Sequence, residues 1–235
     1  MTRFSFKQFD IDQDHCAMKV GTDGVLLGAW CTIDGARHIL DIGTGTGLIA
    51  LMVAQRNLQA RIDAIDIDAD AVQQAHENCA ASPFGARIRV WQADARTFAA
   101  PDGTTYDTIV CNPPYFVDAL KCPDTQRTIA RHNDTLPFDM LLTTVRRLLA
   151  DDGRFSVILP CREALSFSAL ATTHQLHLTR LTHLLPTPSS AEKRRLMEFE
   201  KHPRTLREES LVIELARHCY SPAYRDLTKN FYLKF

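Results

Sequence analysis

The features that this 235-residue sequence lacks already exclude several classes of protein. No stretch approaches eighteen uninterrupted apolar residues, so no segment has the length of a membrane-spanning helix. The N-terminus, MTRFSFKQFDIDQDH, also lacks the charged, then apolar, then small-residue layout of a signal peptide. We therefore expect neither membrane insertion nor secretion, and we expect a cytoplasmic location.

The cysteines and histidines lack the spacing of a disulfide framework or a metal site. The cysteine count is odd and contains no CxxC pair, and the nine histidines show no HxxxH spacing. We expect reduced thiols and no bound metal. The seven cysteines are Cys16, Cys31, Cys79, Cys111, Cys122, Cys161 and Cys219.

The sequence also lacks an excess of charge of one sign. It has 27 basic and 28 acidic residues, so the overall field does not favour a polyanionic partner. One local run, EKRRLMEFEKHPRTLR at 192–207, holds six Lys or Arg against three Glu. Two interpretations stay open for this run: the solvated surface of a strand or loop, or a contact with nucleic acid.

The order of apolar runs predicts one α/β domain with a doubly wound, mostly parallel sheet. The length suits a single domain, and 45% hydrophobic with 23% charged residues is typical of globular proteins. Runs apolar on both faces alternate with helical stretches at 48–55, 69–80 and 137–150, and a turn is expected at 151–153. We expect the sheet to end in an antiparallel pair built from the C-terminal runs. The strand-like runs are HILDIG, IDAID, RIRVWQAD, YDTIVCN, RFSVILP, HLTRLTHLL, RRLMEFE and SLVIELA.

A glycine-rich loop follows the first of these runs. Asp41 precedes Gly43, Gly45 and Gly47, and such glycines let backbone approach a ligand at the start of a helix. The loop does not fit the dinucleotide pattern GxGxxG, because position 48 is Leu. A carboxylate here repels a pyrophosphate but attracts a ligand that carries an ammonium and a sulfonium group.

Polar residues end the next three strand-like runs. Asp66 is placed to accept hydrogen bonds from ribose hydroxyls, and Asp94 with the neighbouring N–H group is placed to read an adenine edge. Asn112 ends the fourth run. Each residue alone is as well explained by a strand end or a helix cap. Together with Asp41 they indicate one ligand site at the carboxyl edge of the sheet.

The sequence Asn112-Pro113-Pro114-Tyr115 carries a second kind of chemistry. The prolines favour extended backbone, so that the Asn112 side chain and the Pro113 carbonyl can accept both hydrogens of an exocyclic amine. That arrangement frees the nitrogen lone pair for in-line attack on a methyl group. Tyr115 offers a flat face for stacking a base or an amide. A rigid turn after a strand is the alternative interpretation.

These motifs together resemble the class I S-adenosylmethionine-dependent methyltransferases that act on amino groups. That family includes enzymes for adenine N6, guanine N2 and glutamine N5, and its fold implies a seven-stranded Rossmann-like sheet. The segment FKQFDIDQDHCAMKVGTDGVLLGAWC and the closing YSPAYRDLTKNFYL resemble bacterial enzymes that methylate N6 of the adenosine 3′ of the anticodon in tRNA(Val). The resemblance is loose between positions 164 and 207. Glutamine N5 enzymes for release factors and guanine N2 enzymes for ribosomal RNA remain the alternatives.

The resemblance implies a role for each matching position. Residues 1–35 form a cofactor-covering segment, 36–160 a cofactor-binding half and 161–235 a substrate-side half. Asn112, Pro113 and Tyr115 form the target pocket. Cofactor contacts are implied for Lys19, Thr22, Asp23, Gly24, Asp41, Gly43, Gly45, Gly47, Asp66, Ile67, Asp94, Ala95 and Asn112.

The expected partner is tRNA, held by local cations rather than by the overall charge. The first group of candidates lies in the basic run, and a second group follows the NPPY motif. These candidates are Lys193, Arg194, Arg195 and Arg204, then Phe116, Arg127 and Arg131.

Overall fold

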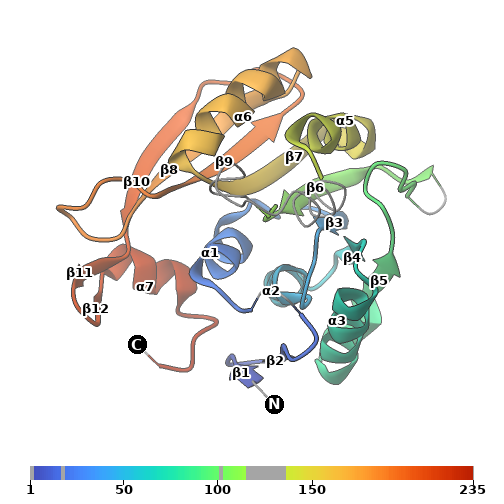
Figure 1. The fold of residues 1–235 in the computed structure, drawn as a ribbon, viewed down its shortest axis with the longest axis horizontal. Coiled ribbons are helices and arrows are strands. Elements are labelled where there is room, and N and C mark those ends of the chain that lie inside the picture. Colours follow the sequence, from blue (N-terminus) through green and yellow to red (C-terminus); the bar gives the residue numbers. More distant parts are fainter. Residues whose placement is uncertain (1–2, 17–18, 101–102, 115–135, 235) are drawn as a thin grey trace, which may run out of the picture.

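The computed structural model describes residues 3–16, 19–100, 103–114 and 136–234. Within these ranges eight strands form one sheet in the order β10-β8-β9-β7-β6-β3-β4-β5 (Figure 1). Five of the positions named above lie outside the described residues: Tyr115, Phe116, Cys122, Arg127 and Arg131.

Five parallel strands form the half of the sheet that follows the predicted βα alternation. Apolar side chains cover both faces of its central strands, which is typical of strands buried between two layers of helices. The strands are β3 (His38–Ile42), β4 (Arg61–Asp66), β5 (Ile88–Gln92), β6 (Tyr106–Cys111) and β7 (Leu149–Pro160).

The C-terminal strands extend this sheet by three. β9 (Arg194–Glu200) is antiparallel to β7 and to β8 (His177–Leu185), which confirms the predicted antiparallel pair. The edge, however, is β10 (Arg207–Val212), which runs parallel to β8 and raises the count from the expected seven strands to eight. The single strand expected at 210–216 is divided, because the chain leaves the sheet after β10 to pair β11 (Glu214–Ala216) with β12 (Cys219–Tyr220).

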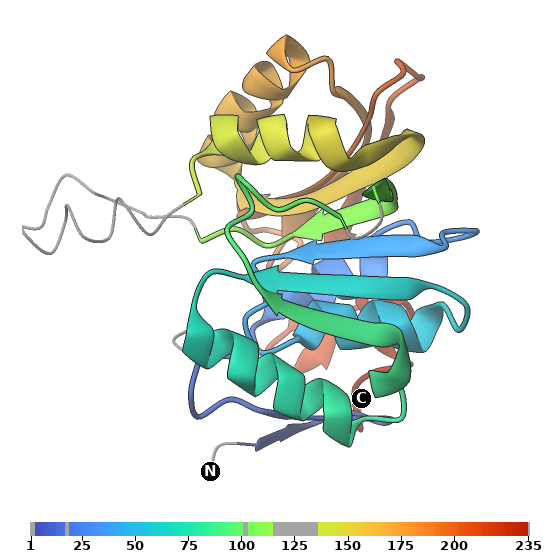
Figure 2. The ribbon, with the colours of Figure 1, turned by 90° about the vertical axis from the view of Figure 1, so that its right-hand side faces the viewer.

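Helices cover both faces of the sheet, so the fold has three layers (Figures 1 and 2). One face carries α1 (Thr22–Trp30), α2 (Leu48–Arg56), α3 (Ala69–Ala81) and α7 (Pro222–Thr228). The other face carries α5 (Phe138–Leu148) and α6 (Cys161–Thr173). The helices predicted at 48–55, 69–80 and 137–150 are thus present, with ends shifted by at most two residues.

The turn predicted at 151–153 is absent, because these residues lie within β7. The pairing of β6 with β7 passes directly from Tyr106–Leu149 to Thr108–Arg154, so that β7 carries extra residues opposite a single residue of β6. Such an irregularity lets a strand absorb Asp and Gly residues without leaving the sheet.

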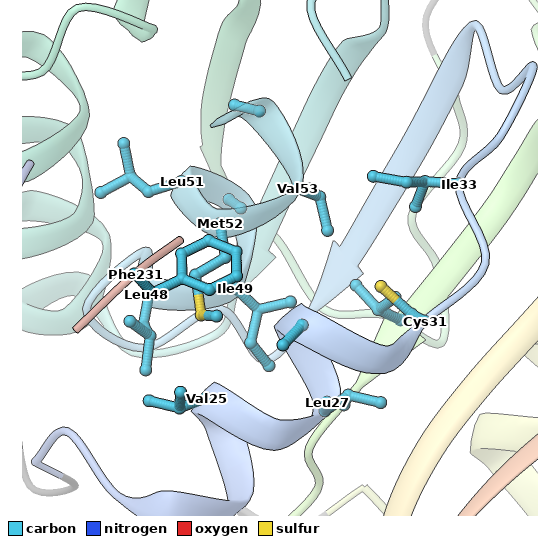
Figure 3. Packing of buried hydrophobic residues seen from close by; sticks show 14 of the residues in the cluster. Val25, Leu27, Cys31, Ile33, Leu48, Ile49, Leu51, Met52, Val53 and Phe231 are labelled. Carbon is cyan, nitrogen blue, oxygen red and sulfur yellow. The ribbon is translucent and has the colours of Figure 1, made fainter. Parts of the chain in front are cut away.

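The N- and C-terminal segments pack against the helices of the first face. Gly28 of α1 lies so close to α2 that an added Cβ atom would stand 2.8 Å from the Met52 sulfur. Phe231, near the C-terminus, is 1% exposed and lies against the same two helices (Figure 3). Phe6 bridges to Tyr232, beside the hairpin of β1 (Arg3–Ser5) and β2 (Asp10–Asp12). Both chain ends therefore support the helices that flank the glycine loop.

Candidate functional site at the carboxyl edge of the sheet

The register of the parallel strands brings the predicted loop and side chains to one edge. Ile42 of β3 pairs with Ile65 of β4 and with Cys111 of β6, so these three residues form one row across the sheet. Along the chain, this row is followed by Gly43 after β3, by Asp66 at the end of β4 and by Asn112 after β6. The edge where parallel strands end is where open α/β sheets bind ligands.

The glycine loop 43–47 has backbone conformations that residues other than glycine rarely adopt. The φ angles of Gly43 and Gly45 are 71° and 54°, in the left-handed region that favours glycine. A Cβ atom built at either position meets nothing within 4 Å, so the loop borders open space. Gly47 (φ 81°) differs, because its Cβ position contacts Ala75 and Cys79 of α3. The first two glycines therefore leave room for a ligand, and the third allows close packing.

Asp41 is a fully buried carboxylate beneath this loop. Its Oδ2 atom accepts hydrogen bonds from the Thr44 hydroxyl (2.7 Å) and the Ala50 amide (3.2 Å). Its Oδ1 atom has no hydrogen-bond partner among the described residues. Burial raises the pKa of Asp41 to about 7, and the charge of Asp66 adds to this rise. A cation bound at the loop would favour the ionised form.

Asp66 and Asp94 are already engaged in local hydrogen bonds. Asp66 accepts from the amide of Gly45 (2.9 Å) and from the amide of Asp68 (3.1 Å), which fixes the loop to the end of β4. The guanidinium of Arg96 binds both oxygens of Asp94 and lowers the pKa of that carboxyl. Asp66 therefore helps to shape the loop in addition to any ligand contact.

Asn112 lies at the end of β6, where the backbone leaves the sheet. Its Oδ1 atom is buried and has no hydrogen-bond partner among the described residues. The first turn of α1 lies beside it, since a Cβ atom at Gly24 would stand 3.9 Å from Asn112 Nδ2 and 3.1 Å from the Leu48 side chain. Pro113 is buried, and Pro114 is exposed. The Asn112 side chain thus lies at the junction of α1, α2 and β6.

Asn78 is a site residue that the sequence reasoning missed. Its Nδ2 atom donates to the Thr46 carbonyl (2.9 Å) and to the Asp12 carbonyl (2.8 Å), and its Oδ1 atom accepts from the Asp12 amide (3.0 Å). It is 4% exposed and joins the glycine loop to the N-terminal segment. The sequence alone does not show that this Asn is buried. Its partners, Thr46 and Asp12, are also distant from it along the chain.

The N-terminal segment lies over the same region. Gln13 accepts a hydrogen bond from the Val20 amide (2.7 Å), and Gln74 of α3 accepts one from the His15 amide (3.3 Å). Burial of Cys16, and then the charge of Asp66, raise the pKa of this thiol to about 11. Lys19 and Thr22 are exposed, and Ile67 is exposed beyond β4, whereas Ala95 is buried.

Most cations of the basic run are paired with carboxylates. Arg194 binds Asp23 of α1 at 2.9 Å, Arg195 binds Glu192 at 2.9 Å, and Arg204 binds Glu200 at 2.6 Å. Lys193 is exposed, and its ammonium group forms no ion pair within the described ranges. The positive charge available to bind a phosphate backbone is therefore smaller than the number of Lys and Arg residues in this run indicates.

Two structural features are absent from the described residues. Its His, Cys, Asp and Glu side chains form no group of three placed to hold a metal ion. None of its helices is long and apolar enough to cross a membrane.

The fold and the site define a class of proteins. The crystal structure of a predicted O-methyltransferase, Atu636 from Agrobacterium tumefaciens, superposes with a TM-score of 0.69 over 89% of this chain and 96% of that one. The two sequences are 22% identical, so this likeness concerns the fold alone. That fold is the Rossmann-like fold of methyltransferases, as the sequence predicted.

The sequence comparisons define the family. The family model described as methyltransferase small domain matches residues 20–158. The protein named tRNA1(Val) (adenine(37)-N6)-methyltransferase in Phocaeicola vulgatus is 55% identical to this chain, over 98% of this chain and 97% of the relative. The relative of that name in Flavobacterium johnsoniae is 46% identical, over 98% and 99%. The chain belongs to the methyltransferase small domain family and, within it, to the family of these tRNA1(Val) (adenine(37)-N6)-methyltransferases.

Proposed function

We propose that this chain transfers the methyl group of S-adenosylmethionine to N6 of an adenosine in tRNA, the adenosine 3′ of the anticodon in tRNA(Val). The observation that carries the proposal is the buried Oδ1 atom of Asn112, which has no hydrogen-bond partner among the described residues and lies at the edge shared with the glycine loop. A buried acceptor without a donor is costly unless a ligand satisfies it. The names of the relatives support tRNA as the ligand whose adenine amino group donates this hydrogen bond.

The residues at the edge fit S-adenosylmethionine. Open space at Gly43 and Gly45 accommodates a ligand against the backbone. The Oδ1 atom of Asp41, which no described residue donates to, suits a cationic methionine end. Asp66 and Asp94 then face the ribose and the adenine. S-adenosylmethionine supplies the methyl group, activated by a sulfonium leaving group.

The chain acts mainly by orientation. Asn112 Oδ1 and the Pro113 carbonyl accept the two hydrogens of adenine N6, which withdraws the nitrogen lone pair from ring conjugation and points it at the methyl carbon. The same two oxygens stabilise the positive charge that grows on N6 during transfer. A bond from N6 to the methyl carbon forms as the sulfur–methyl bond breaks, and the surplus N6 proton leaves to solvent. Tyr115, outside the described residues, is proposed to stack on the base.

Cations of the basic run are proposed to hold the RNA backbone. Lys193 and Arg195 lie at the start of β9, beside the carboxyl end of β7, and remain candidates. Arg204 follows the other end of β9 and binds Glu200, which pairs with Arg154 of β7, so it lies toward the opposite edge of the sheet and is no candidate for this site. Arg127, Arg131 and Phe116 are further candidates outside the described residues. An unpaired adenosine of an anticodon loop is easier to extrude than a base of a duplex.

The test is to incubate the purified chain with labelled S-adenosylmethionine and separate pools of tRNA, ribosomal RNA, DNA and release factor. Label at N6 of the adenosine 3′ of the anticodon in tRNA(Val) is the expected result. An Asn112→Ala variant is the matched control, since it should transfer the label about a hundredfold more slowly in a single turnover. Label on a release factor or on guanine N2 of ribosomal RNA would overturn the proposal.

A further inference from the structure

The ion pair between Asp23 and Arg194 joins the N-terminal helix α1 to the C-terminal strand β9. Arg194 Nε lies 2.9 Å from Asp23 Oδ2, although the residues are 171 positions apart. The side chains are only 30% and 24% exposed, so solvent screens the pair less than an open surface pair. Arg194 begins β9 on the substrate side, and Asp23 lies in the first turn of α1.

Among the described residues, no side chain caps the start of α1. Gly21 precedes the helix without a side-chain hydrogen bond to cap it, and Gly21 and Thr22 are both exposed. The acidic Asp23 suits a helix N-terminus, and Arg194 anchors that carboxylate to the sheet. The turn is thus fastened by a side chain from a distant strand.

The position of this turn decides what surrounds Asn112. Gly24, adjacent to Asp23, lies close to both Asn112 and Leu48 of α2. Arg194 is aligned with Pro160 at the end of β7, and β7 pairs with β6, which carries Asn112 at its end. A shift of the α1 turn would therefore move the wall between the glycine loop and the acceptor amide.

We propose that Arg194 is a positioning residue that holds the first turn of α1 over the cofactor site, and that it is not a phosphate contact. The inference rests on the proposed function, because it concerns the same site. Lys193, one residue earlier and exposed, provides a natural comparison, because it is a candidate phosphate contact without an ion pair among the described residues.

The test compares Arg194→Gln, Arg194→Lys and Lys193→Gln in the full chain. We expect Arg194→Gln to raise the dissociation constant of S-adenosylmethionine about threefold to tenfold, the scale of a coupled, partly exposed ion pair. It should leave the salt dependence of tRNA binding unchanged, and Arg194→Lys should restore part of the cofactor affinity. Lys193→Gln should show the reverse pattern, flattening the log–log salt slope by a little under one unit.

Two further measurements keep the inference separate from misfolding and from the proposed function. Without ligand, hydrogen exchange of the amides at 22–26 should quicken in Arg194→Gln while the sheet stays protected. In a double-mutant cycle, Asp23→Asn with Arg194→Gln should cost no more cofactor affinity than the worse single variant. A flattened tRNA salt slope in Arg194→Gln, with unchanged cofactor affinity, would overturn the inference alone. A wild-type chain that binds no S-adenosylmethionine would overturn the proposed function itself.

Discussion

The buried carboxyl of Asp41 gives a prediction whose size follows from the structure. Burial raises its pKa from an ordinary 3.8 to about 7. The folded chain therefore holds a proton on Asp41 that the unfolded chain releases above pH 4, and stability is lost as pH rises from about 4 to about 7. The pKa difference is about 3, and each pKa unit corresponds to about 1.4 kcal/mol. The full effect on the free energy of unfolding is then about 4 kcal/mol.

The perturbation that isolates this effect is Asp41→Asn. The amide oxygen can still accept from Thr44 and Ala50, but the side chain no longer ionises. Urea unfolding of both proteins without cofactor is compared at pH 5 and at pH 8. Other titrating groups contribute equally to both and cancel in the difference. Between these pH values the wild type should lose about 2–3 kcal/mol relative to Asp41→Asn.

Cofactor affinity should depend on the same carboxyl, but it should rise with pH where stability falls. A cation beside Asp41 stabilises its ionised form, so binding releases a proton and the affinity of wild type for S-adenosylmethionine should rise between pH 6 and pH 8. Asp41→Asn should bind more weakly and with a flatter pH profile. Calorimetry in two buffers of different ionisation enthalpy measures the released proton. If the stabilities of the two proteins follow parallel pH profiles, Asp41 is ionised throughout and the reasoning is wrong.

Three further substitutions test other parts of the site. Asp66→Ala should weaken S-adenosylmethionine binding by about 1.5–3 kcal/mol in calorimetry, and Asp70→Ala, at an exposed position nearby in α3, is its control; equal affinities would remove Asp66 from the site. Asn112→Ala should keep cofactor affinity but slow single-turnover transfer about a hundredfold, and a variant that transfers at the wild-type rate would exclude the polarising role. Asn78→Ala leaves the Thr46 carbonyl and both Asp12 backbone groups without their partner, so urea unfolding should show a loss of about 2–3 kcal/mol; an unchanged midpoint would mean that this bridge contributes nothing.

The sequence determined the features that depend on local pattern. Runs apolar on both faces predicted buried parallel strands, and the polar residue after each run placed Asp66, Asp94 and Asn112 at one edge. This inference succeeds because parallel strands end at the same side of a sheet whatever their order. The glycines of the loop were equally readable, since left-handed φ angles at Gly43 and Gly45 require that residue type.

Only the tertiary structure decided which distant groups meet. The edge strand β10 runs parallel to β8, because the chain crosses over after β9 instead of turning back as a hairpin. Arg194 has Asp23 as its partner, and Asn78 has Thr46 and Asp12. Such pairings depend on strand order and on which face of an element a side chain occupies, and neither is encoded in local spacing. For that reason a run of cations that reads as a basic patch is, in the folded chain, largely a set of ion pairs.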